Sequence, residues 1–241
     1  MRKKDEIVAQ LAALGLRHGD IVMTHASLRR VGPIEGGAAA LIEAQRAAVG
    51  AAGTLLMVLS ATDDTFDART SPVDVTELGW LAETFRTHPG VVVSDHPASR
   101  FGALGIAAVA LLEPTPLHDY YGPGSVLERF TNRGGKVLRL GANPDTVTLT
   151  HYAEYLADLP HKNRVRRRYV RADTGELWID SLDDTDGIAK WQHGDYFPQI
   201  LLDYRASGAV CGGEVGACDA ELFDARDFVA FAVAWMNRRL R

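Results

Sequence analysis

The residues best suited to chemistry form a short run between Thr146 and Glu154, directly after a predicted strand. His151 lies three residues before Glu154, so the two side chains share one face of a helix. A neutral imidazole is well suited to accept a proton near pH 7, and it needs a carboxylate to hold its tautomer and to stabilise the imidazolium that forms. Placement at a helix N-terminus helps to keep the free ring neutral. The run is therefore a candidate site for a general base.

The same spacing also fits a structural role, in which Thr148 caps the helix while His151 and Glu154 face solvent or make structural hydrogen bonds. Spacing alone favours this structural interpretation.

Two acidic clusters could bind cations or simply face water. Asp183, Asp184 and Asp186 occur within four residues after a predicted hairpin, and one of them could turn toward a histidine. A similar cluster begins with Asp63 and Asp64. Carboxylates this close repel one another, so a fold either keeps them together for a purpose or leaves them in a solvated turn. Neither cluster has the spacing of an EF-hand calcium loop.

Other reaction classes lack their motifs. The G-x-S-x-G pattern of hydrolases with an acyl-serine is absent, as are a phosphate-binding loop and a dinucleotide-binding glycine pattern. His25, His96 and His151 could form a three-histidine metal site at strand ends, but the sequence gives this little support and we expect no metal.

The composition is that of a globular protein. The chain has 241 residues, of which 46% are hydrophobic and 24% are charged, and its net charge is -5. This acidic excess argues against nucleic acid as a partner and suits a cationic ligand. No stretch approaches the roughly 18 apolar residues of a membrane span, and we see no secretory signal, so we expect a cytoplasmic protein with no membrane partner. Two cysteines cannot form a disulfide framework.

The hydrophobic pattern predicts strands that alternate with helices in a single domain over residues 1–241. We predict strands at 21–24, 54–59, 91–93 and 136–140, and a hairpin of 167–172 with 176–180. Helices are predicted at 5–14, 38–49, 76–87, 148–159, 190–205 and 221–239, and Ser125 with Glu128 fits a capping box. The alternation implies an α/β layered fold, with a mainly parallel central sheet flanked by helices and a late β-hairpin.

Several runs of the sequence occur in the order of a known family. The most specific are the His-Pro run at His96 and the Thr-to-His-x-Ala-Glu run that ends at Glu154; others lie at 20–28, 36–44, 53–57, 66–73, 79–86 and 224–229. On these residues the chain resembles the aminoglycoside 3-N-acetyltransferases, an antibiotic N-acetyltransferase family distinct from the GNAT fold. Ala26 replaces a serine of the family's usual first turn, and the loop at 61–70 is short, which leaves the acceptor open.

The resemblance implies acetyl transfer from acetyl-CoA to the 3-amino group of a 2-deoxystreptamine aminoglycoside, giving antibiotic resistance. It implies that His151 is the general base and that Asp186 supports it, with Asp184 nearby. Contacts to the drug would come from Asp63, Asp64, Glu154 and Asp183. Contacts to CoA would come from Ser27, Leu28, Arg29, Val31, Gly32, Ser94, His96, Arg100 and Phe101.

Two alternatives remain open at this point. The chain could be an acyltransferase of the same fold for a different small-molecule amine, or a CoA-binding relative without catalysis. We expect neither an acyl-enzyme nor a metal, and either a monomer or a homodimer.

Overall fold

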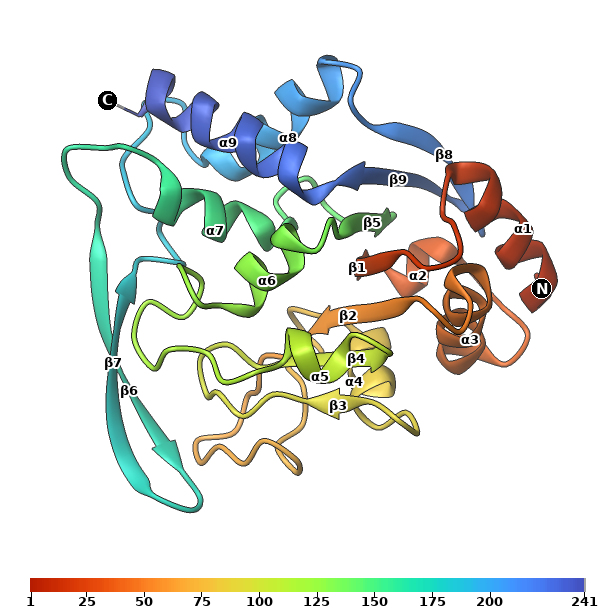
Figure 1. The fold of residues 1–241 in the computed structure, drawn as a ribbon, viewed down its shortest axis with the longest axis horizontal. Coiled ribbons are helices and arrows are strands. Elements are labelled where there is room, and N and C mark those ends of the chain that lie inside the picture. The colour runs from red at the N-terminus through yellow and green to blue at the C-terminus, as the bar shows by residue number, and fades with distance from the viewer. Residues whose placement is uncertain (241) are drawn as a thin grey trace.

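A seven-stranded sheet with the order β3-β4-β2-β1-β5-β9-β8 runs through the middle of the molecule (Figure 1). The computed structural model describes residues 1–240. The three central strands, β2 (Thr54–Val58), β1 (Ile21–Ala26) and β5 (Lys136–Leu140), are parallel. On one side β4 (Phe101–Gly105) and β3 (Val92–Val93) pair antiparallel, and on the other side β9 (Cys218–Asp224) and β8 (Cys211–Val215) do so. The predicted α/β fold is confirmed; its parallel pairing holds at the centre of the sheet, and the outer strands pair antiparallel.

The central strands send alternate side chains into two hydrophobic cores, because successive residues of a strand face opposite sides. On β1, for example, Val22 belongs to one core and Met23 to the other. The first core is covered by α1 (Lys4–Leu14), α3 (Gly37–Val49) and α4 (Trp80–Arg86). The second is covered by α5 (Ala108–Leu111), α6 (Val126–Asn132), α7 (Leu149–Leu156), α8 (Tyr196–Ala206) and α9 (Ala225–Arg239). The short helix α2 (Leu28–Val31) follows β1.

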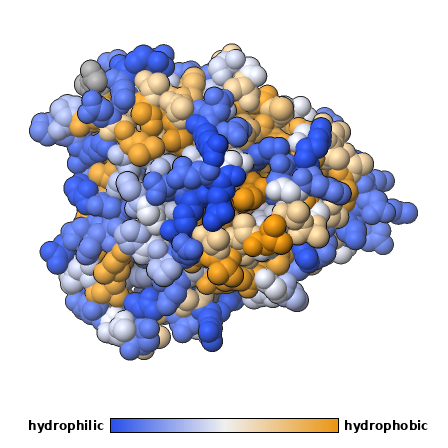
Figure 2. All heavy atoms as spheres, in the orientation of Figure 1, coloured by the Kyte–Doolittle hydropathy of each residue, from blue (hydrophilic) through white to orange (hydrophobic). Residues whose placement is uncertain are grey.

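The predicted hairpin is present as a separate two-stranded sheet of β6 (Arg164–Arg171) and β7 (Gly175–Leu182). Figure 1 shows it beside the main sheet, and Figure 2 shows mostly hydrophilic residues along this edge. The backbone N–H of Phe66 donates to the carbonyl of Val170 over 2.7 Å, which ties the hairpin to the loop at 61–73. At its other end β7 leads directly into the acidic segment that begins at Asp183, so the hairpin positions those carboxylates.

The structure differs from the predicted elements mainly at the edges of the sheet. β4, β8 and β9 were not predicted, and the helix expected at 221–239 begins only at Ala225, because residues up to Asp224 form β9. The carboxylate of Asp224 caps this helix by accepting from the backbone N–H groups of Arg226 and Asp227. Within residues 1–240, every helix is too short or too polar to cross a lipid bilayer.

Candidate active site

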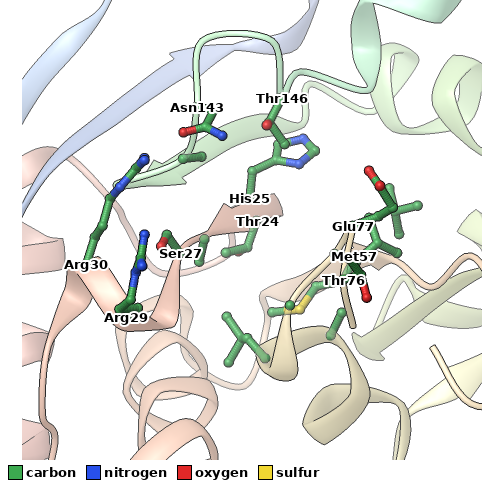
Figure 3. A pocket seen from close by; sticks show the side chains of 17 residues that line it. Thr24, His25, Ser27, Arg29, Arg30, Met57, Thr76, Glu77, Asn143 and Thr146 are labelled. Atoms are coloured by element: carbon green, nitrogen blue, oxygen red, sulfur yellow. The ribbon is translucent and has the colours of Figure 1, made fainter. Parts of the chain in front are cut away.

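Two adjoining pockets form a groove at the carboxyl ends of β1, β2 and β5, where open α/β sheets usually bind ligands. The smaller has a volume of about 250 Å³ and the larger of about 800 Å³. Residues from two loops line both pockets and therefore mark where they meet: Thr76, Glu77, Leu78, Asn143 and Thr146. In the smaller pocket, Arg29 and Arg30 lie at one end and Glu77 at the other (Figure 3). Two ligands, one bound in each pocket, would therefore lie next to each other at this junction.

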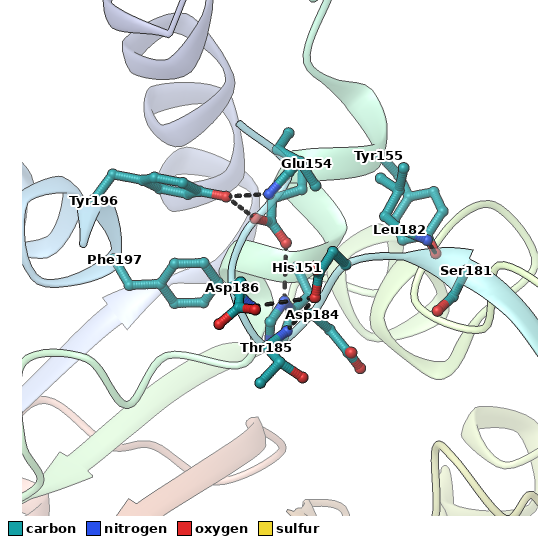
Figure 4. A network of polar contacts seen from close by, with 12 residues as sticks. His151, Glu154, Tyr155, Ser181, Leu182, Asp184, Thr185, Asp186, Tyr196 and Phe197 are labelled. Atoms are coloured by element: carbon teal, nitrogen blue, oxygen red, sulfur yellow. Dashed lines mark hydrogen bonds and ion pairs between the residues drawn. The ribbon is translucent and has the colours of Figure 1, made fainter. Parts of the chain in front are cut away.

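His151 and Glu154 form a hydrogen-bonded pair on α7, and His151 lines the larger pocket (Figure 4). The ring atom Nδ1 of His151 lies 2.9 Å from Oε2 of Glu154, as expected for residues three apart on a helix. The Glu154 side chain is only 1% exposed, and its other oxygen accepts a hydrogen bond from the hydroxyl of Tyr196. Because Glu154 occupies Nδ1, Nε2 is the ring nitrogen left for a ligand.

Tyr196 completes the setting of the buried carboxylate. Its hydroxyl oxygen accepts from the backbone N–H of Ile188 over 2.9 Å while the hydroxyl donates to Glu154. Burial, together with the negative charge of Glu154, raises the pKa of Tyr196 far above its usual value. The phenol therefore stays protonated and remains a hydrogen-bond donor.

The positions of Glu154 and Asp186 differ from those expected. We predicted that Asp186 would support His151 and that Glu154 would contact the substrate, whereas the carboxylate on the imidazole is that of Glu154. Asp186 is exposed on the wall of the larger pocket, and its backbone N–H donates to Asp183 over 3.1 Å. The helical spacing of His151 and Glu154 was the signal that identifies the partner.

Asp183 and Asp184 are both engaged by other residues. The Asp183 carboxylate accepts from the backbone N–H groups of Thr185 and Asp186 and so shapes the loop. Asp184 accepts from the Tyr120 hydroxyl over 2.6 Å and pairs with Arg167, yet it still lines the larger pocket. Of the two, only Asp184 lines the larger pocket.

The larger pocket is strongly acidic. Its described lining holds one lysine, Lys190, and five carboxylates, those of Glu77, Asp145, Asp184, Asp186 and Asp195. Clefts lined by one sign of charge concentrate ligands of the opposite sign.

Asp63 and Asp64, which we expected to contact a substrate, are exposed and belong to the lining of neither pocket. Glu77 and Asp145 are carboxylates of the larger pocket's lining that no motif in the sequence marked.

The expected CoA contacts near β1 divide into two groups. Ser27 and Arg29 line the smaller pocket, together with the neighbouring Arg30. Leu28 and Val31 pack into the first core, Val31 with 1% exposure. The backbone N–H of Gly32 donates to the carbonyl of Leu28, which ends α2. Only the first group lines the smaller pocket.

The second predicted group of CoA contacts, at residues 94–101, serves the fold instead. The Ser94 hydroxyl accepts from the backbone N–H of Phe101, and Phe101 is fully buried in the core. The ring of His96 bonds to the backbone of Leu117 and Ala98. Arg100 is fully buried and donates to the carbonyls of Leu59, Ala68, Ser71 and Pro72. These four side chains are buried, and none of them lines either pocket.

His25 is a buried histidine that sequence spacing did not explain. It lines the smaller pocket, and its Nε2 has no hydrogen-bond partner among residues 1–240. Burial, and secondarily the charge of Arg139, lowers the pKa of His25 to about 3, so the ring is neutral at neutral pH. The three-histidine site that the sequence left open is not formed, since no three potential metal ligands lie together in the described part of the chain.

Replacing His25 by glutamine is expected to reduce the acid sensitivity of the fold. The folded pKa of about 3 lies below the reference value of 6.5, so the unfolded chain takes up the proton first as the pH falls. Between these two pKa values, His25 lowers the free energy of unfolding by about 1.4 kcal/mol for each unit by which the pH falls. Glutamine does not titrate and has no such effect. Urea unfolding of both proteins between pH 7 and pH 4 measures the difference. Parallel pH dependences would contradict the assignment.

Comparison with known proteins gives a consistent result. A family model described as aminoglycoside 3-N-acetyltransferase matches residues 23–237. The chain is 36% identical to aminoglycoside N(3)-acetyltransferase VII of Streptomyces paromomycinus, over 98% of this chain and 92% of that protein. It is 37% identical to aminoglycoside N(3)-acetyltransferase III of Serratia marcescens, over 99% of this chain and 98% of that protein.

Solved structures of similar proteins share the fold. A binary complex of AAC-IIIb with CoASH superposes with a TM-score of 0.93 at 37% identity, covering 99% of this chain and 97% of that one. Sisomicin-bound AAC-VIa gives a TM-score of 0.92 at 33% identity, with 99% of both chains covered. The groove therefore lies in a fold for which a complex with CoASH and a complex with sisomicin are known.

Proposed function

Because the chain belongs to the aminoglycoside 3-N-acetyltransferase family, we propose that it transfers the acetyl group of acetyl-CoA to the 3-amino group of a 2-deoxystreptamine aminoglycoside, giving antibiotic resistance. The observation that carries the proposal is the hydrogen-bonded pair of His151 and Glu154, which lies in an acidic pocket that adjoins a second, arginine-bearing pocket.

The charges of the two pockets suit the two substrates. Aminoglycosides carry several ammonium groups, and the larger pocket presents five carboxylates against one lysine. The phosphates of CoA are anionic, and Arg29 and Arg30 line the smaller pocket. The guanidinium of Arg30 already donates to the carbonyl of Gly141 over 2.6 Å, which orients it. We assign the acceptor to the larger pocket and the thioester to the smaller one.

His151 acts as the general base in this scheme. The amine reacts in its neutral form, because a protonated amine has no lone pair for attack. As this neutral amine adds to the thioester carbonyl, Nε2 of His151 accepts a proton from its nitrogen. The charge of Glu154 stabilises the imidazolium that forms. When the tetrahedral intermediate collapses, the C–S bond breaks, the amide forms and the thiolate of CoA leaves. Both substrates meet directly in the groove, so no acyl-enzyme forms.

Release of the CoA thiol tests the proposal. With acetyl-CoA and a gentamicin-, tobramycin- or apramycin-type acceptor, we expect thiol release that depends on the acceptor, and NMR of the product should show acetylation at the 3-amino group. With acetyl-CoA alone, the mass of the enzyme should not change. Release only with other amines would favour an acyltransferase for a different acceptor, and CoA binding without turnover would favour a non-catalytic relative. Either result would overturn the proposal.

A further inference from the structure

The ring of His151 packs against two aromatic rings from distant parts of the chain. The Tyr121 ring is stacked on the imidazole, with ring centroids 5.1 Å apart and planes inclined by 9°. The Phe197 ring lies 4.9 Å away and is tilted by 56° (Figure 4). The His151 side chain is left with 16% exposure. The two rings, which we call the aromatic pair, thus both contact an imidazole that is largely buried.

We propose that the aromatic pair, Tyr121 and Phe197, positions His151 and favours its protonated form during proton transfer; this inference rests on the function proposed above. The face of an aromatic ring carries partial negative charge and attracts a cation. A stacked ring such as Tyr121 presents this face to the imidazole. The attraction is stronger for the imidazolium than for the neutral ring, so it grows as the amine loses its proton.

The first turn of α8 contacts both His151 and Glu154. Tyr196 donates to Glu154, and its neighbour Phe197 contacts the ring of His151. This turn is fixed by Asp195, whose carboxylate accepts from the backbone N–H of Phe197 over 2.9 Å. One short segment therefore sets the position of the carboxylate and of the imidazole together.

Tyr121 acts through its ring rather than through a charge. Burial, followed by the negative charge of Asp184, raises the pKa of Tyr121 far above its usual value, so the phenol stays neutral.

Other ionisable groups also surround His151, and none of them is changed by substitution of the two rings. Glu154 contacts it from α7, and the remaining groups line the pocket: Glu77, Asp145, Asp184, Asp186, Lys190, Asp195 and Tyr196.

The pH dependence of kcat/KM tests the proposal. Leucine at position 197 keeps an apolar side chain but removes the ring, whereas Phe197→Tyr retains the ring and is the matched control. For Phe197→Leu we expect the midpoint of the acid limb to fall by about 0.5 pH units and kcat to fall about threefold. The direction follows because a less stabilised imidazolium gives up its proton at lower pH. Tyr121→Leu should act in the same direction, and Tyr121→Phe should match the wild type.

A second readout does not depend on turnover. In the resting enzyme, the imidazole NMR signals of His151 should titrate with a lower midpoint in Phe197→Leu than in the wild type and Phe197→Tyr. Phe197 is half-buried, so the leucine variant is expected to fold, and its melting temperature verifies this. If folded leucine variants titrate with the wild-type midpoint, the inference is overturned even if acetyl transfer is confirmed. If no aminoglycoside is acetylated, the titration still decides the inference.

Discussion

Replacing His151 by alanine is expected to lower kcat for acetyl transfer by about 10²- to 10⁴-fold in a protein that still folds. In the proposed mechanism the variant lacks the nitrogen that takes the amine proton, while the acidic pocket assigned to the acceptor is intact, so KM should change much less. Steady-state thiol release at saturating acetyl-CoA measures both constants. A variant with nearly wild-type kcat would show that another group removes the proton.

Two further carboxylate variants distinguish the geometry from the sequence-based assignment. Glu154→Gln should also lower kcat by about 10²- to 10⁴-fold, because an uncharged partner no longer stabilises the imidazolium. Asp186→Asn serves as the control and should lower kcat by less than about tenfold, since Asp186 lies on the pocket wall and its backbone N–H is bonded to Asp183. The opposite order of effects would restore Asp186 as the supporting acid.

Replacing Arg100 by leucine is expected to lower the free energy of unfolding by about 3–5 kcal/mol. The guanidinium is fully buried, and its loss leaves backbone carbonyls of the loop at 59–72 without donors. Burial lowers the pKa of Arg100 to about 10, which still leaves it charged at neutral pH. Urea unfolding at neutral pH measures the loss.

A surface arginine provides the matched control for Arg100. Arg164 pairs with Asp119, and both side chains are nearly half exposed, so Arg164→Leu should cost less than about 1 kcal/mol. The comparison also tests the role first assigned to Arg100. If Arg100 contacted CoA, Arg100→Leu would weaken CoA binding by the folded protein and leave its unfolding midpoint unchanged.

The parallel centre of the fold could be predicted from the sequence, and the outer strands could not. β1, β2 and β5 are largely buried apolar runs between helices, which is a strong signal. β4 contains Gly102 and Gly105, and glycine is a poor strand former. The packing requires these glycines, because a Cβ at Gly102 would lie 2.6 Å from the Leu59 side chain and one at Gly105 would lie 2.2 Å from the carbonyl oxygen of Gly53. The same residues that permit close packing remove the strand pattern.

In the candidate site, contacts between residues near in the sequence could be predicted, and contacts between residues far apart in the sequence could not. The contact of His151 with Glu154 follows from helical spacing and was within reach of the sequence. Tyr196 on α8 meets Glu154 across 42 residues, and the ring of Tyr121 comes from a loop before α6, so no spacing relates them to His151 and Glu154. The burial of Arg100 was missed for a related reason, since an arginine in a family motif gives no indication of its burial.

The two borders of the main sheet bear on how the protein behaves at high concentration. An edge strand exposes unpaired backbone N–H and C=O groups, which can pair with another chain and start aggregation. Here β3 is only two residues long, and β8 includes two glycines and the charged Glu214. Both borders are thus poor templates for intermolecular pairing, which favours accumulation of the folded chain without fibrous or amorphous deposits.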